Sequence, residues 1–200
     1  MTAVVPPVAA RPAGAGRVTA VALVVAGCAA LLARPWVNAA TDPTAALAVL
    51  FVALGTVGAL CPLPGAAYRR EAAARLAPAR TSAVVALVGV GAFTAGRVLA
   101  GGRAPAPALA TYVVLNTLAA VAEEAFFRRL LYGLLEPHGQ ALAAGGAAAA
   151  FAVVHLTVWG AWALPLDLAA GLVLSWQRAT TGRWSVPAFT HAAANVLAVL

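Results

Sequence analysis

Long apolar runs, separated by short segments that carry arginine, make up most of this 200-residue chain. Hydrophobic residues account for 63% of the sequence and charged residues for 10%, whereas a soluble domain has about 25% charged residues. Such a chain cannot cover its surface with charge, so we expect it to fold within a membrane. Apolar runs of this length form helices in a bilayer, because every backbone polar group must be paired internally. The sequence therefore predicts an all-α, polytopic transmembrane helix bundle.

The apolar runs predict about seven membrane spans. Residues 1–16 are rich in proline, alanine and glycine and are expected to form a disordered tail. Residues 17–104 hold the first three spans, and residues 105–200 hold the other four. The predicted spans cover approximately residues 18–32, 44–63, 82–101, 108–135, 141–158, 164–178 and 185–200. Asp42-Pro43 before the second span is a helix-start signal.

The distribution of arginine predicts the orientation of the chain. With a cytoplasmic N-terminus, ten arginines fall in cytoplasmic segments, two (Arg34 and Arg103) fall in outer segments, and Arg97 lies near the end of a span. Positive charge favours the cytoplasmic side, so the count predicts a cytoplasmic N-terminus.

The same placement of arginine bears on partners and location. Arginines at the ends of apolar runs are typical of topology signals rather than of a phosphate-binding face, so we expect no nucleic-acid partner. The alanine-rich composition, with arginine but no lysine, indicates a GC-rich bacterial gene. We expect a multi-pass protein of a bacterial cell membrane that contacts membrane lipids. The oligomeric state is not predicted.

Two adjacent carboxylates, Glu123 and Glu124, lie inside the fourth predicted span, in a chain with only six acidic residues. An ionised side chain at the bilayer centre costs at least ~2.5 kcal/mol, and such residues usually face the bundle interior. Glu124 and Arg128 are four residues apart and share a helix face, which predicts an ion pair. Glu123 is turned about 100° away and is left to face another group. Two solvated acids at a helix end are a less favoured reading, because the pair precedes the arginines by several residues.

Two further polar pairs follow, Phe151-x-x-x-His155 in span five and His191-x-x-x-Asn195 in span seven. Each alone also fits a structural role, as a histidine or an amide hydrogen-bonded within a helix bundle. From the predicted cytoplasmic ends of their helices, Glu123 and His155 lie roughly 18 and 21 Å deep at 1.5 Å per residue. His191 and Asn195 lie roughly 9 and 15 Å deep. We expect the four polar groups to meet between the inner half and the middle of the bilayer.

A glutamate and two histidines around a water molecule allow two chemistries. The carboxylate and an imidazole can act together as a general base. Alternatively, Glu123, His155 and His191 can hold Zn²⁺, whose bound water ionises near neutral pH. Asn195 and the remaining histidine can donate hydrogen bonds to an oxyanion. Both chemistries fit hydrolysis of a peptide bond within the membrane.

Other protease chemistries lack their residues in this sequence. It contains neither an HExxH zinc motif nor a GxSxG serine elbow. Asp167 is the only aspartate near the interior of a span, so an aspartyl pair has no second member.

The ordered set of motifs resembles the CPBP family of intramembrane glutamate proteases, also called the CAAX protease or Abi family. That family carries EExxxR with a phenylalanine before the arginine, then FxxxH, then HxxxN. The corresponding segments are Glu123-Glu124-Ala125-Phe126-Phe127-Arg128, Phe151-Ala152-Val153-Val154-His155 and His191-Ala192-Ala193-Ala194-Asn195. The resemblance covers about residues 105–200. Leu168-Ala169-Ala170-Gly171 is a weaker match, with leucine where phenylalanine is frequent, and Arg129 replaces a frequent glycine.

The resemblance implies an intramembrane endopeptidase with a membrane-associated peptide or protein substrate. Glu123 would be the general base, assisted by His155, and His191 and Asn195 would stabilise the oxyanion. The supporting residues would be Glu124, Phe127, Arg128 and Phe151. The family pattern leaves open whether the enzyme is a metalloprotease. Two alternatives are a non-catalytic immunity or scaffold protein of the same fold and a proton-coupled transporter, since chains of glutamate and histidine also mark ion pathways.

Overall fold

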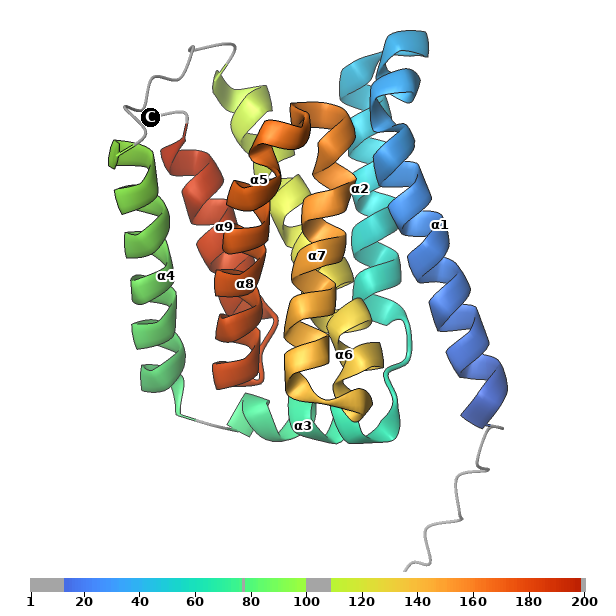
Figure 1. Cartoon of the computed structure of the whole chain (residues 1–200), viewed down its shortest axis with the longest axis vertical. Coiled ribbons are helices and arrows are strands. Elements are labelled where there is room, and N and C mark those ends of the chain that lie inside the picture. The colour runs from blue at the N-terminus through green and yellow to red at the C-terminus, as the bar shows by residue number, and fades with distance from the viewer. Residues whose placement is uncertain (1–12, 77, 100–108, 199–200) are drawn as a thin grey trace, which may run out of the picture.

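The computed structural model describes residues 13–76, 78–99 and 109–198, and all regular secondary structure among them is helical. Figure 1 shows the long helices lying roughly side by side, with the short helix α3 across one end of the bundle. The α-helices are α1 (Ala13–Ala40), α2 (Pro43–Leu60), α3 (Gly65–Leu76), α4 (Ala79–Leu99), α5 (Leu109–Glu124), α6 (Tyr132–Leu135), α7 (Gln140–Trp159), α8 (Leu164–Thr181) and α9 (Ser185–Leu197). Shorter segments are the π-helix η1 (Ala125–Leu131) and the 3₁₀ turns η2 (Glu136–His138) and η3 (Ala161–Ala163). The predicted all-α bundle is confirmed.

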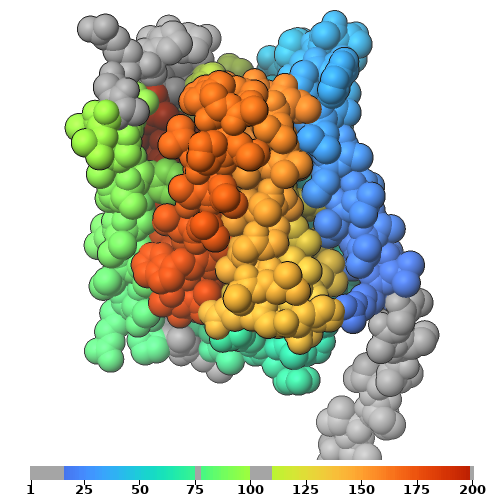
Figure 2. Space-filling model, viewed as in Figure 1, coloured from blue at the N-terminus to red at the C-terminus, as the bar shows by residue number. Residues whose placement is uncertain are grey.

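Large apolar side chains cover much of the outside of the bundle. So many exposed large apolar side chains are unusual for a soluble monomer and suit contact with lipid. Figure 2 shows one face of the bundle, formed by α7 and α8, with α1 along one side and α4 along the other. The exposed side chains include Val49, Leu60, Leu87, Val98, Leu99, Leu166 and Phe189.

Five helical stretches are long and apolar enough to cross a membrane: Gly16–Ala40, Pro43–Leu60, Ala79–Leu99, Ala110–His138 and Gln140–Trp159. These correspond to the first five predicted spans. α8 and α9 lie in the same bundle (Figure 1) but do not meet these criteria. At 1.5 Å per residue, the 13 residues of α9 extend about 20 Å, less than a hydrocarbon core of about 30 Å. The count of about seven spans stays a prediction.

The first helix is longer at both ends than the predicted span of residues 18–32. It begins at Ala13, inside the predicted disordered tail, and the rest of that tail lies outside the described residues. It ends at Ala40, only three residues before α2 begins. The predicted start of the second span is confirmed, because the Asp42 carboxylate accepts hydrogen bonds from the backbone N–H groups of Thr44 and Ala45.

The arginine-rich segment after α2 forms the helix α3 rather than an extended loop. This helix buries Ala67, Glu71 and Ala74 against the end of the bundle. Its Arg70 pairs with Glu136 at 2.6 Å, which links α3 to the end of the fourth predicted span. α3 is therefore a polar helix that closes one end of the bundle.

The fourth predicted span is continuous, but it is not α-helical throughout. The π-helical segment η1 begins directly after Glu124. π-Helical turns are rare and frequently occur at functional sites. Its aromatic residues Phe126 and Phe127 are fully buried and stack edge to face, with ring centroids 5.1 Å apart. The ring of Phe126 also fills the space beside Gly27, where an added Cβ would lie 2.5 Å from it.

Helix α2 contacts the backbone of η1 directly. A Cβ on Gly58 would lie 2.5 Å from the backbone of Ala125 and Phe126, so only glycine allows this approach. Arg129 donates from Nη1 to the carbonyl oxygens of Gly58 and Cys61, at 2.7 and 3.0 Å. The arginine that replaces the frequent family glycine therefore caps the C-terminal end of α2.

Candidate active site

The predicted ion pair between Glu124 and Arg128 is confirmed. Arg128 Nη1 lies 2.9 Å from Glu124 Oε1, and both side chains are fully buried. The guanidinium also donates from Nη2 to the carbonyl of Gly171 at 3.1 Å and lies 4.5 Å from the centroid of the Phe151 ring. Buried charges persist only when they are paired and hydrogen-bonded in this way. The pair therefore anchors the end of α5 to α7 and α8.

Gly171, the glycine of the weaker sequence match, has a structural role in α8. An added Cβ there would lie 3.0 Å from Ala148 Cα, so the glycine permits the close packing of α8 on α7. The same residue supplies the carbonyl that accepts from Arg128.

Glu124 has a second partner, which sequence reasoning did not predict. His191 Nδ1 lies 2.9 Å from Glu124 Oε1, the oxygen that also accepts from Arg128. A carboxylate can only accept, so Nδ1 carries the proton and Nε2 is the ring nitrogen left for other contacts. Glu124 therefore orients His191 as well as Arg128.

His155 is oriented by the helix on which it lies. Its Nδ1 is 2.7 Å from the carbonyl oxygen of Phe151. Because a carbonyl oxygen only accepts, Nδ1 carries the proton, and Nε2 of the neutral ring is an acceptor. This Nε2 lies 3.9 Å from Glu123 Oε1, beyond hydrogen-bonding distance. The predicted partners Glu123 and His155 thus present two acceptors to each other.

Asn195 contacts the helix that carries the two glutamates. Its Nδ2 donates to the backbone carbonyl of Asn116 at 3.2 Å. The other N–H of this amide and the oxygen Oδ1 are left for further contacts.

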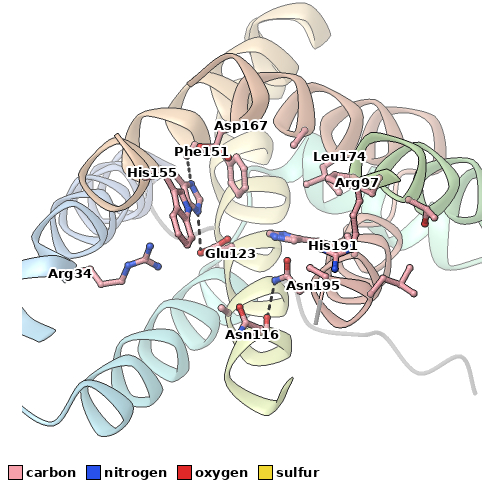
Figure 3. Close-up of a pocket in the computed structure, with 18 residues that line it drawn as sticks. Arg34, Arg97, Asn116, Glu123, Phe151, His155, Asp167, Leu174, His191 and Asn195 are labelled. Carbon is pink, nitrogen blue, oxygen red and sulfur yellow. Dashed lines mark hydrogen bonds and ion pairs between the residues drawn. The ribbon is translucent and has the colours of Figure 1, made fainter. Parts of the chain in front are cut away.

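Glu123, His155, His191 and Asn195 line one cavity of about 580 Å³, so the structure brings together the four predicted residues (Figure 3). Phe151 packs on both histidine rings, at centroid distances of 4.5 Å from His155 and 5.8 Å from His191. The volume is typical of a small-molecule or peptide-segment site. The other lining residues are Arg34, Phe93, Thr94, Arg97, Asn116, Ala119, Trp159, Asp167, Ala170, Leu174, Ala194, Leu197 and Ala198.

Two of the four site residues lie near the C-terminal ends of their helices. His155 is four residues from the end of α7, and Asn195 is two residues from the end of α9. These ends lie at the end of the bundle where α1 finishes (Figure 1). With a cytoplasmic N-terminus, the cavity would therefore open toward the outer side. The predicted depth, between the inner half and the middle of the bilayer, stays a prediction.

Three charged residues of the cavity were not predicted as site residues. Asp167 lines the cavity and interacts electrostatically with Glu123 and both site histidines. Its Oδ2 is buried and has no hydrogen-bond partner among the described residues. The sequence singled out Asp167 only as an aspartate without the second member of an aspartyl pair. Arg34 and Arg97 were interpreted as topology signals.

The predicted zinc ligands do not form a three-ligand set in this arrangement. Among the residues that the structure describes, no three His, Cys, Asp or Glu side chains lie close enough to hold a metal ion. Nδ1 of His191 is directed to Glu124, which leaves Nε2 as its free ring nitrogen. Zinc binding by Glu123, His155 and His191 therefore stays a prediction.

The comparisons with known proteins point to the same half of the chain. Residues 105–197 match the family model for the type II CAAX prenyl endopeptidase Rce1-like domain. Comparisons with curated proteins and with solved structures each gave no match. The matched segment contains all four predicted catalytic residues, whereas Arg34 and Arg97 lie before it. The match covers just under half of the chain, and it confirms the resemblance of this segment to the CPBP, or CAAX protease, family that the three sequence motifs indicated.

Proposed function

We propose that this protein is an intramembrane endopeptidase of a bacterial cell membrane that hydrolyses a peptide bond in a membrane-associated peptide or protein. The family supports peptidase activity at a general level. The observation that carries the specific mechanism is the pair of acceptors, Glu123 Oε1 and His155 Nε2, which face each other at 3.9 Å in a cavity.

A water molecule between Glu123 and His155 would satisfy both acceptors. It would donate one hydrogen to the carboxylate and one to Nε2, leaving an oxygen lone pair for attack on a substrate carbonyl. General-base catalysis of this kind contributes about 10²–10⁴-fold to a rate. As the C–O bond forms, the water proton moves to this pair. It is later delivered to the amide nitrogen as the C–N bond breaks.

His191 and Asn195 are the proposed oxyanion donors. Asn195 has one N–H that is not used by Asn116. His191 already donates from Nδ1 to Glu124, so its Nε2 donates only when the ring is protonated. The hydrogen bond to Glu124 fixes the orientation of the ring. In this scheme Glu124, Arg128, Phe127 and Phe151 position the reacting groups and do not touch the substrate.

Substitution of Glu123 by glutamine tests the proposal. Glu123→Gln removes the carboxylate while keeping its size, so kcat/KM on a peptide library should fall at least about 10²-fold. The purified proteins would be compared in detergent, with products read by mass spectrometry. Glu136→Gln is the matched control, because Glu136 pairs with Arg70 and does not line the cavity. Equal cleavage by Glu123→Gln and wild type would contradict the assignment.

Two variants separate the peptidase from the two alternative functions. A non-catalytic immunity or scaffold protein would keep its cellular phenotype after Glu123→Gln. A proton-coupled transporter would show proton flux in liposomes that His155→Ala abolishes. The proposed peptidase shows neither behaviour.

A further inference from the structure

Two arginines in the cavity have no role in the chemistry proposed above. Arg34 of α1 and Arg97 of α4 are partly buried and line the same cavity as Glu123. Neither guanidinium makes a hydrogen bond or ion pair within the described part of the chain. Both helices lie outside the segment that matches the family, so the matched segment alone would leave the cavity without these two cations.

The two arginines approach the reactive groups from different sides. In Figure 3 the side chain of Arg34 points toward Glu123, while Arg97 lies on the other side, near His191. Arg34 interacts electrostatically with Glu123, and its guanidinium lies 5.9 Å from the centroid of the Phe51 ring. A group bound to Arg34 would therefore lie close to the water position proposed between Glu123 and His155.

Cations in this position need an explanation. Charged side chains inside a membrane protein are rare and mark substrate or ion sites. The two fully buried arginines, Arg128 and Arg178, donate hydrogen bonds within the bundle: Arg128 to Glu124 and Gly171, and Arg178 to the carbonyl of Arg128. Arg34 and Arg97 differ because their donors face the cavity. The planar guanidinium fork matches a carboxylate, which it can bind through two parallel hydrogen bonds.

We propose that Arg34 and Arg97 form an anion-recognition site that binds a carboxylate of the substrate near the scissile bond. This inference rests on the proposed peptidase function and adds a substrate class, peptides that carry a carboxylate close to the cleaved bond. Two sources supply that chemistry, a free C-terminus and an Asp or Glu side chain. Both could reach the arginines, because a cavity of about 580 Å³ accommodates a short peptide segment.

Three peptide libraries distinguish these sources. The first has free C-terminal carboxylates and no internal acidic residue. The second has the same sequences with C-terminal amides, and the third is amidated with one internal Asp or Glu. A charge-assisted hydrogen bond is roughly twice as strong as a neutral one, so wild type should cleave the first or the third library at least about tenfold faster than the second. Equal cleavage of all three would overturn the proposal.

Arginine variants show whether the preference comes from these residues. Arg34→Gln and Arg97→Gln should each lower the ratio of the cleavage rate of the charged library to that of the neutral library. Arg34→Lys should restore part of the preference. Arg80→Gln at the other end of α4 is the matched control. If Arg34→Gln slows cleavage of the charged and neutral libraries equally, Arg34 acts on Glu123 rather than on the substrate. Its assignment to the anion-recognition site is then wrong. An unchanged preference in both glutamine variants would show that the arginines do not cause it, and would also overturn the proposal.

A binding measurement separates this proposal from the proposed peptidase activity. The probe is one dansyl-labelled hexapeptide of alternating alanine and leucine, made as the free acid and as the amide. Wild type in detergent should bind the acid more tightly than the amide, and both arginine-to-glutamine variants should remove the difference. If nothing is cleaved but this difference is present, the anion site stands and the peptidase function fails. Equal binding of both forms would overturn the anion site.

Discussion

At the scale of single residues, one carboxylate oxygen organises the site. Glu124 Oε1 accepts from both Arg128 and His191, which lie on different helices. The adjacent Glu123 faces the cavity instead. Two neighbouring carboxylates thus have different environments: Glu124 is paired through Oε1 with Arg128 and His191, and Glu123 is open to a ligand. This difference follows from their separation of one residue on a helix, which directs the side chains to different faces.

Asp167 is the cavity residue most in need of a test. Its carboxylate interacts with Glu123, His155 and His191, although it contacts none of them by a hydrogen bond that the structure shows. Its charge changes the electrostatic potential at the proposed catalytic groups, and electrostatic stabilisation of the transition state is often the largest contribution to catalysis. Asp167→Asn should therefore lower kcat, by less than the ~10²-fold that loss of a direct oxyanion donor costs.

The measurement for Asp167 is a comparison of kcat and KM in detergent against wild type. Asp42→Asn is a suitable control, because Asp42 caps α2 and does not line the cavity. A change in KM alone would assign Asp167 to substrate binding and contradict the proposed electrostatic role.

At the scale of elements, the π-helical segment η1 is supported by the residues packed around it. Arg178 donates from Nε to the carbonyl of Arg128 within η1, and α2 contacts the backbone of the segment at Gly58. Arg129 links the same segment to the end of α2. The π-helical geometry of η1, directly after Glu123 and Glu124, therefore depends on contacts with α2 and α8 as well as on the sequence of η1.

Gly58→Ala tests this dependence. The added methyl group would lie 2.5 Å from the backbone of Ala125, so α2 and η1 would have to move apart. Overpacking of this kind typically costs about 1–3 kcal/mol. We expect a lower melting temperature in detergent and reduced activity, because the movement displaces the adjacent glutamates.

Gly96→Ala is the matched control for that substitution. Gly96 lies in α4, and an added Cβ there has no other atom within 4 Å. Replacing a helical glycine by alanine at an open position should stabilise by up to about 1 kcal/mol. Equal melting temperatures for Gly58→Ala and Gly96→Ala would show that α2 does not constrain η1.

Sequence patterns predicted those features of the fold and of the site that depend on the spacing of residues within one helix. The pair Glu124–Arg128 follows from their separation of four residues, and the cap at Asp42 follows from its position before Pro43. The contact between His191 and Glu124 joins residues 67 positions apart, and no local pattern encodes it. The presence of Arg34 in the cavity likewise depends on how α1 packs against the matched domain. Such contacts arise from tertiary packing, which helical periodicity does not specify.

At the scale of the whole molecule, arginine is unevenly distributed between the two ends of the bundle. Arg17, Arg69, Arg70, Arg80 and Arg183 belong to the end at which α1 begins and α3 lies (Figure 1). The cavity extends toward the opposite end, with Arg34 and Arg97 in its walls. The excess of positive charge predicts that the α3 end faces the cytoplasm. The cavity would then be reached from the outer side of the membrane.

Single cysteines provide the test of this orientation. In a background that lacks Cys28 and Cys61, Trp162→Cys places a thiol at an exposed position near the cavity end, and Tyr68→Cys places one on exposed α3. A membrane-impermeant maleimide added to intact cells should label Trp162→Cys and should label Tyr68→Cys only after permeabilisation. The opposite pattern would place the cavity on the cytoplasmic side. A substrate would then have to come from the cytoplasm, whereas the expected pattern requires one that is exposed at the outer face.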